Sequence, residues 1–275
     1  MCDETFTFGP RGTGAALPAE AAPPPLLDVL DAAAFARERL GFEPDAQQER
    51  VLRSEAKLGI LNCSRQWGKS TTAAAKAVHR AFTRPGCVVL VASPSQRQSG
   101  EFVRKSGEMM RRLGIVPRGD GDNECSLLFP NGSRIIGLPG TEATLRGFSA
   151  SLLLIDEASR VEDAMYEALT PMLAASGGDL WLLSTPFGKR GFFYETWELG
   201  GAAWERVSGP ATECPRIPKE FLEQERARKG EQMFRREYMC EFMDSGAGSF
   251  DRDLVERMLK DTVRPMNLGW RLSNF

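Results

Sequence analysis

The sequence predicts an α/β fold in which a mostly parallel central sheet is flanked by helices. Four short apolar runs, LGILNC, CVVLVAS, SLLLIDEAS and DLWLLSTP, alternate with longer amphipathic stretches between residues 57 and 209. Continuous rather than alternating hydrophobicity indicates strands that are covered on both faces, as in parallel sheets. Each run ends in small or polar residues. Since ligands of such sheets bind at the carboxyl ends of the strands, we expect a ligand site at that edge.

Length and composition limit the class of protein. With 275 residues, 42% of them hydrophobic, the chain has room for one substantial core, or for a core with a small appended subdomain. The formal charge of -2 means that any nucleic-acid contact must come from a local basic patch. Six dispersed cysteines without a CxxC pair and a single histidine argue against disulfides and zinc, and favour a reducing cytoplasm. The sequence shows no long apolar span and no secretion leader, so we expect no membrane association.

The elements follow in order along the chain. Residues 1–25 are rich in Gly, Pro and Ala and predict a flexible N-terminal arm. The core is expected over residues 26–209, beginning with one helix in LLDVLDAAAFARERLGF that stops at Gly41. SLLFPNGSRIIGL contains two β-like runs around Asn131-Gly132, which predicts a hairpin added antiparallel at the sheet edge.

The strand-like runs end near Gly209, where the pattern becomes helical and charged. IPKEFLEQERARKGEQMFRREYMCEFMDS predicts two helices broken at Gly230, within a helical lid subdomain over residues 210–250. Residues 251–275 form a short, weakly patterned tail.

NCSRQWGKSTT matches the phosphate-loop pattern G-x-x-x-x-G-K-[ST] except that Cys63 stands first. Such a loop wraps phosphate oxygens with backbone N–H groups at a helix N-terminus, and supplies a lysine for the phosphates and a hydroxyl for Mg²⁺. LGILN before the loop and STTAAAKAVHRAF after it provide the strand and the helix. Cysteine is small, so the turn survives if its φ stays negative. The predicted nucleotide-binding residues of the loop are Cys63, Ser64, Arg65, Gln66, Trp67, Gly68, Lys69, Ser70 and Thr71.

Two polar side chains near this loop have two interpretations each. Arg65 could reach or sense the γ-phosphate, or could be a solvated loop arginine. In PDAQQERVL, the amide of Gln47 or Gln48 could read the adenine edge, or both could belong to a surface helix rich in glutamine.

Asp156 and Glu157 follow the apolar run SLLLI directly. A carboxylate at a strand tip can hold Mg²⁺ through water, and the next one can polarise a water for in-line attack on a γ-phosphate. An acidic pair at a strand end is also common in solvated loops. Its position a little under ninety residues after the phosphate loop makes the catalytic interpretation more specific.

The sequence contains three further candidate segments. Ser184, Thr185 and Pro186 close the run DLWLLSTP, either as a detector of the γ-phosphate or as a simple strand-ending turn. Arg146 in TEATLRGFSAS either acts in a neighbouring subunit's site or forms a surface ion pair. The helix QRQSGEFVRKSGEMMRR and the basic residues before FF in KRGFF either contact DNA phosphates or are solvated.

Taken together, CSRQWGKST, LLLIDEAS, STPFGKRGFFYE and REYMCEF resemble the ATPase domain of the large terminase subunit, the DNA-packaging motor of tailed bacteriophages. The resemblance runs from about Gly41 to Phe250. Members of this family characteristically replace the first loop glycine and carry Arg-Gln or a similar pair inside the loop. Cys63 is therefore expected in this family rather than disabling.

The resemblance implies a RecA-like (ASCE) P-loop ATPase with a small helical lid, which uses ATP and Mg²⁺ to move double-stranded DNA into a viral procapsid. It implies a homo-oligomeric ring that works on the portal protein with the small terminase subunit. Such a motor works in the host bacterial cytoplasm, transiently docked at the procapsid portal.

The family's functional residues carry over by position. Gln48 best fits the adenine-reading glutamine, with Gln47 as the fallback. Ser70 and Asp156 fit the Mg²⁺ site, Glu157 fits the catalytic carboxylate, and Ser184 to Pro186 fit the coupling motif. The family's two arginine roles fall on Arg65, which contacts or senses the γ-phosphate, and on Arg146, which acts in trans.

One departure and two alternatives remain. Large terminases usually continue into a metal-dependent nuclease domain, which would begin near SGAGSF, so we expect no nuclease activity from these residues. The same motifs would serve a helicase-like or remodelling P-loop ATPase, although only one core is visible. A third interpretation is an assembly module that binds nucleotide without turnover.

Overall fold

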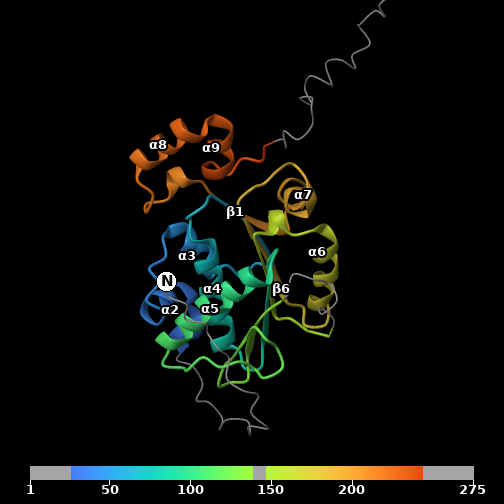
Figure 1. The fold of residues 1–275 in the computed structure, drawn as a ribbon. Coiled ribbons are helices and arrows are strands. Elements are labelled where there is room, and N and C mark those ends of the chain that lie inside the picture. Colours follow the sequence, from blue (N-terminus) through green and yellow to red (C-terminus); the bar gives the residue numbers. More distant parts are fainter. Residues whose placement is uncertain (1–25, 139–146, 244–275) are drawn as a thin grey trace, which may run out of the picture. The chain divides into compact units, whose positions relative to one another are not determined.

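The computed structural model describes residues 26–138 and 147–243 (Figure 1). The predictions for the N-terminal arm, the C-terminal tail and Arg146 therefore lie outside the described residues. Within the described ranges, no helix is long and apolar enough to cross a membrane.

The described part contains a seven-stranded sheet in the order β3-β4-β2-β5-β6-β1-β7. Neighbouring strands are parallel except at one edge, where β3 runs antiparallel to β4. The predicted α/β fold class with a mostly parallel sheet is thereby confirmed, and the hairpin lies at the edge as expected. The strands are β1 (Leu58–Cys63), β2 (Val88–Ala92), β3 (Ser126–Leu128), β4 (Arg134–Gly137), β5 (Leu152–Asp156), β6 (Asp179–Ser184) and β7 (Trp204–Gly209).

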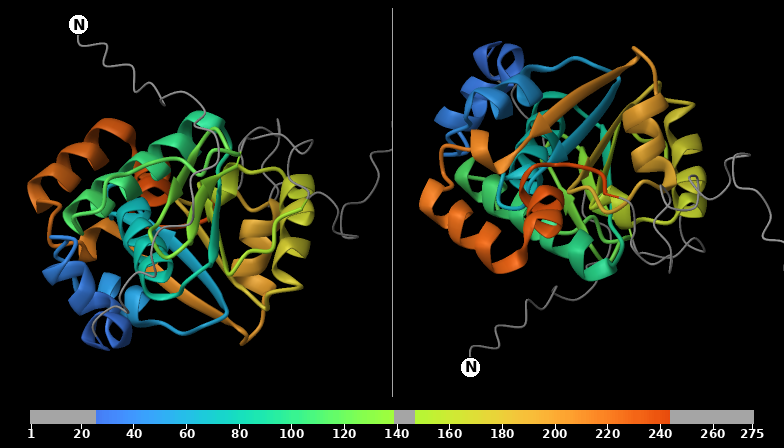
Figure 2. Two further views of the ribbon diagram at one scale, coloured as in Figure 1. Left: turned by 90° about the horizontal axis from the view of Figure 1, so that it is seen from below. Right: turned by 90° about the horizontal axis from the view of Figure 1, so that it is seen from above.

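Helices cover both faces of the sheet, which explains the continuous apolar runs (Figures 1 and 2). Along β5, Leu152 and Leu154 belong to one buried cluster, while Leu153 and Ile155 belong to the other. The first cluster lies under α2 (Ala32–Glu38), α3 (Ala46–Arg53), α4 (Lys69–Thr83) and α5 (Gln96–Arg112). The second lies under α6 (Asp163–Leu169) and α7 (Gly191–Leu199).

The first helical stretch is two helices, not the single helix that its spacing predicted. α1 covers Leu26–Leu30, and Asp31 separates it from α2. The Asp31 side chain accepts hydrogen bonds from the backbone N–H groups of Ala33 and Ala34, at 2.9 and 3.1 Å. An aspartate that satisfies these otherwise unpaired donors is a strong N-cap, so the chain begins a new helix there.

Two helices, α8 (Lys219–Lys229) and α9 (Glu231–Tyr238), follow the 3₁₀ turn Ala211–Glu213, in the segment predicted to be a lid and called the lid below. Gly230 joins them with φ +78°, a backbone conformation that favours glycine. Leu222, Phe234 and Tyr238 form a small buried cluster of their own. Residues 210–243 belong to the same compact unit as the core, and the proposed domain boundaries stay predictions.

Candidate nucleotide-binding site

The phosphate loop lies between β1 and α4, at the carboxyl edge of the sheet. Gly68 is the N-cap residue of α4 with φ +96°, and Gln66 has φ +64°. Among the non-glycine residues in the described ranges, only Gln66, Glu157 and Cys240 have positive φ. Cys63 therefore keeps an ordinary backbone conformation, and the loop does not require glycine in its first position.

The side chain of Cys63 is buried at the end of β1, where Cys63 pairs with Gly209 of β7. Burial raises the pKa of its thiol well above the usual value. A Cβ atom on Gly209 would lie 2.8 Å from Cys63 Sγ and still closer to the indole of Trp67. The loop thus packs two of its side chains into the end of the sheet, and Gly209 leaves the space for them.

Two polar side chains, those of Gln48 and Arg216, fix the backbone of the loop by hydrogen bonds to one carbonyl. Gln48 Nε2 donates to the carbonyl of Trp67 at 2.8 Å, and its Oε1 accepts from the N–H of Asp45. Arg216 donates to the same Trp67 carbonyl at 2.7 Å and pairs with Asp45 at 2.9 Å. Gln48 is buried beside the loop with its amide in use, and Gln47 is half-buried. An adenine-reading role for either glutamine stays a prediction.

Lys69 is the central cation of the loop and is 7% exposed. Its ammonium donates to the carbonyls of Cys63 and Ser64, at 3.2 and 3.0 Å, and to Thr185 Oγ1 at 3.0 Å. One predicted coupling residue, Thr185, is thus in direct contact with the phosphate-loop lysine.

The residues predicted to hold Mg²⁺ lie together. Ser70 Oγ, in the first turn of α4, donates to Asp156 Oδ2 at the end of β5 at 2.7 Å. β6 separates β5 from β1, the strand that precedes α4. The other carboxylate oxygen of Asp156 accepts from the N–H of Glu157 at 3.0 Å. A hydroxyl and a carboxylate are hard oxygen ligands of the kind that Mg²⁺ takes alongside water and phosphate. The pair therefore fits the ion.

Glu157 has φ +53°, unusual for a residue with a side chain, just where β5 ends. Its carboxylate lies 3.9 Å from Arg160 Nε. Ser159, two residues on, donates through its hydroxyl to the Thr185 carbonyl at 2.8 Å. The hydroxyl of Ser184 lies 2.7 Å from that of Ser159. The turn that follows the acidic pair is therefore joined by hydrogen bonds to the predicted coupling segment.

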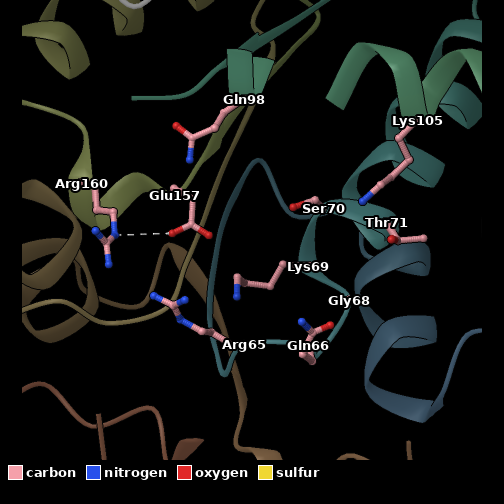
Figure 3. Close-up of a pocket in the computed structure, with 10 residues that line it drawn as sticks. All are labelled: Arg65, Gln66, Gly68, Lys69, Ser70, Thr71, Gln98, Lys105, Glu157 and Arg160. Atoms are coloured by element: carbon pink, nitrogen blue, oxygen red, sulfur yellow. Dashed lines mark ion pairs between the residues drawn. The ribbon is translucent and has the colours of Figure 1, made fainter. Parts of the chain in front are cut away.

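A pocket of about 540 Å³ opens over the phosphate loop, a usual size for a small-molecule site (Figure 3). Seven residues that the sequence predicted line it: Arg65, Gln66, Gly68, Lys69, Ser70, Thr71 and Glu157. Three others that line it were missed: Gln98, Lys105 and Arg160.

Each missed residue has a signal in the sequence. Gln98 and Lys105 are seven residues apart, so two helical turns place them on one side of the helix that follows β2. Arg160 stands three residues after Glu157, within reach across one turn. Gln98 and Lys105 lie in the helix that the sequence offered only as a candidate for DNA contact, and Arg160 lies just outside the run SLLLIDEAS.

Residues 60–257 match the family described as terminase large subunit, T4likevirus-type, N-terminal. The large terminase subunits of Thermus phage G20c and Thermus virus P23-45 are each 28% identical over 183 residues. Each match covers 59% of this chain and 38% of the relative, so it spans well under half the length of these curated relatives.

Two solved structures have a similar fold. The ATPase domain of the Thermus phage P74-26 large terminase gives a TM-score of 0.64 at 23% identity, covering 76% of this chain and 98% of that one. The large terminase of bacteriophage HK97 gives a TM-score of 0.65 at 15% identity, covering 78% of this chain and 55% of that one.

Proposed function

The chain belongs to the family of T4-like terminase large subunit N-terminal domains, and from this premise we propose that it hydrolyses ATP to drive double-stranded DNA into a viral procapsid. The observation that carries the proposal is the set of groups around one pocket. A helix N-terminus, a buried lysine, a hydroxyl–carboxylate pair and a second carboxylate surround the space above the phosphate loop. These are the groups that phosphoryl transfer to water requires.

Each step of ATP hydrolysis can be assigned to particular residues of the chain. The N–H groups of the loop and Lys69 bind the phosphate oxygens, because the positive end of the α4 dipole points to them. Ser70 and Asp156 would hold Mg²⁺, which neutralises phosphate charge when bound. Glu157 orients a water and accepts its proton as the water's oxygen attacks the γ-phosphorus. The bond from the γ-phosphorus to the bridging oxygen breaks, and ADP leaves.

The coupling segment would register the phosphate through its existing contacts. Lys69 donates to Thr185, and Ser184 contacts the turn that follows Glu157. When the γ-phosphate is lost, the Lys69 ammonium loses one of its hydrogen-bond acceptors, and its hydrogen bond to Thr185 changes as a result. Pro186 ends this segment, and the change passes from there to the chain before α7.

Support for nucleotide binding comes from a relative. The large terminase of a thermophilic bacteriophage has been solved in complex with ADP and with ATP-γ-S, at 13% identity to this chain. For this chain we infer the same ligand class, with Mg²⁺ as the metal. We also infer a homo-oligomeric ring in the host cytoplasm, docked on the portal protein and served by the small terminase subunit.

Arg146 is assigned to the neighbouring subunit's site, which makes hydrolysis depend on assembly. The test is steady-state ATP hydrolysis per chain over a wide range of protein concentration, for the parent chain and for Arg146→Ala. Arg104→Ala is the control, because Arg104 is an exposed residue of α5 that pairs with Glu101 and Glu108. Activity that rises with concentration only in the parent chain and the control supports the motor.

Activity that is independent of concentration and of Arg146 would remove the trans role and leave a self-sufficient ATPase. ATP binding without turnover at any concentration would favour an assembly module.

A further inference from the structure

The helix α5 divides its polar side chains between two neighbouring sides. Phe102, Val103 and Met110 are buried against the core. Gln98 and Lys105 line the pocket. Because they are separated by two turns, they lie above one another on the helix.

On the adjacent side of α5, the charged side chains form ion pairs with one another. Arg104 donates through Nε to Glu101 Oε2 at 3.0 Å and also pairs with Glu108. All three side chains are about half exposed. These pairs are solvated helix contacts of the ordinary i,i+3 and i,i+4 kind.

The cations of the pocket differ in how they are used. Arg65 pairs with Glu237, and Arg160 lies 3.9 Å from Glu157. Lys69 donates to three oxygens. Lys105 is half-buried, and no hydrogen bond or ion pair joins it to any residue in the described ranges. Figure 3 shows it beside Ser70 and Thr71, with Arg65 on the far side of Lys69.

We propose that Lys105 is a nucleotide-binding residue whose ammonium contacts the triphosphate from the side opposite Arg65. The assignment rests on the proposed ATPase function and adds a residue that no phosphate-loop or acidic motif contains. A half-buried lysine directed into a pocket of phosphate-binding groups gains a charge-assisted hydrogen bond when a polyphosphate arrives. Before that, it keeps the pocket cationic on the side of α5.

Gln98 strengthens the same interpretation. Its Oε1 accepts from the Ser95 hydroxyl at 2.9 Å, so its NH₂ group remains available to donate into the pocket. The two residues of α5 that line the pocket, Gln98 and Lys105, are therefore both potential donors, while the nearby Glu101 is paired with Arg104.

The experiment is calorimetric titration of ATP-γ-S and of ADP, with Mg²⁺, onto the parent chain, Lys105→Gln, Lys105→Arg and Arg104→Gln. We expect Lys105→Gln to weaken ATP-γ-S binding about tenfold, the loss of one charge-assisted contact. Lys105→Arg, which keeps the charge, should recover most of the affinity. Arg104→Gln, its neighbour on the solvated side, should bind as the parent does. Equal melting temperatures exclude a folding effect.

The outcomes separate the two claims. If the parent chain binds nucleotide and Lys105→Gln binds it equally well, the assignment of Lys105 is overturned while the proposed function stands. If a parallel titration with double-stranded DNA shows that Lys105→Gln lowers only the affinity for DNA, the assignment is also overturned, and α5 is a DNA-contacting helix. If the parent chain binds neither nucleotide, the proposed function fails first.

Discussion

Arg65, inside the phosphate loop, forms an ion pair with Glu237 of the lid helix α9. The backbone N–H of Arg65 also donates to the Glu237 carbonyl at 3.3 Å. Three residues further on, the carbonyl of Cys240 accepts from Asn62 Nδ2 of β1 at 2.8 Å. The lid is therefore fastened to the strand and the loop that would bind phosphate, through the one loop arginine that a γ-phosphate would attract.

Glu237→Gln should loosen the lid and free Arg65. Without its carboxylate partner, Arg65 can turn to the phosphate, so we expect ATP-γ-S affinity to rise roughly threefold, within the range of a half-exposed ion pair. Amide hydrogen exchange in α9 should become faster in the absence of nucleotide. Glu231→Gln removes an exposed pair with Arg226 in the same lid and is the matched control. Slower exchange, or weaker binding than in that control, would contradict the arrangement.

Placing a glycine at position 63, as in the phosphate-loop pattern, should improve neither the stability of the protein nor its affinity for ATP. Cys63 has an ordinary φ and a buried side chain, so Cys63→Gly removes packing and adds chain entropy without relieving strain. We expect a loss of about 1–2 kcal/mol in the free energy of unfolding, measured by urea denaturation, and no gain in ATP affinity. Cys63→Ala should cost less, since it keeps Cβ. A more stable glycine variant would show that the loop is strained at this position.

Gly209→Ala should disturb the loop from outside it. The added Cβ collides with the Trp67 indole and lies 2.8 Å from Cys63 Sγ. Overpacking of this kind costs about 1–3 kcal/mol, and the displaced loop should bind ATP-γ-S more weakly. Gly100→Ala is the control, because its Cβ would meet only Cys125 Sγ at 3.8 Å and a helical alanine is favourable. Unchanged melting and binding in Gly209→Ala would refute the predicted collision.

The lid should weaken in acid through Glu225. Lys229 and Tyr238 donate hydrogen bonds to its carboxylate, at 2.8 and 2.7 Å, and lower its pKa to about 2 from the usual 4.5. Because the folded-state pKa is the lower one, this stabilisation is complete above about pH 4.5 and is lost as the pH falls towards 2.

Glu225→Gln should therefore melt below the parent chain near neutral pH, and the difference should shrink as the pH is lowered through that window. Thermal melting of both proteins over a pH series measures it. A difference that stays constant would mean that the carboxylate charge contributes nothing.

Much of the fold could be predicted because buried parallel strands are recognisable in the sequence as continuous apolar runs. In β5, neighbouring leucines enter different clusters, so the run has to be continuously apolar. β7 was missed for the opposite reason. Its WERVSG sequence includes Glu205 and Arg206, which an edge strand tolerates because one side remains near solvent. The break at Asp31 shows that one good N-cap overrides a continuous helical pattern.

The site was predictable where a residue type is required by its chemistry, as for Lys69, Ser70 and Asp156. It was not predictable where geometry alone brings a side chain in, as for Lys105, which reaches the pocket from another helix. The partners of Arg65 and Gln48 were equally hidden, because each contact joins segments far apart in sequence. Family membership agrees with the resemblance drawn from the motifs.

In the proposed reaction, Glu157 activates water for attack on ATP held over the phosphate loop. The most direct measurement compares Glu157→Gln with the parent chain for both ATP-γ-S affinity and steady-state ATP hydrolysis, at a concentration where the parent turns over. We predict nearly equal affinity and a fall in hydrolysis of at least about 100-fold, because the amide cannot accept the proton. Hydrolysis that persists at the parent rate in the variant would show that Glu157 does not activate the water.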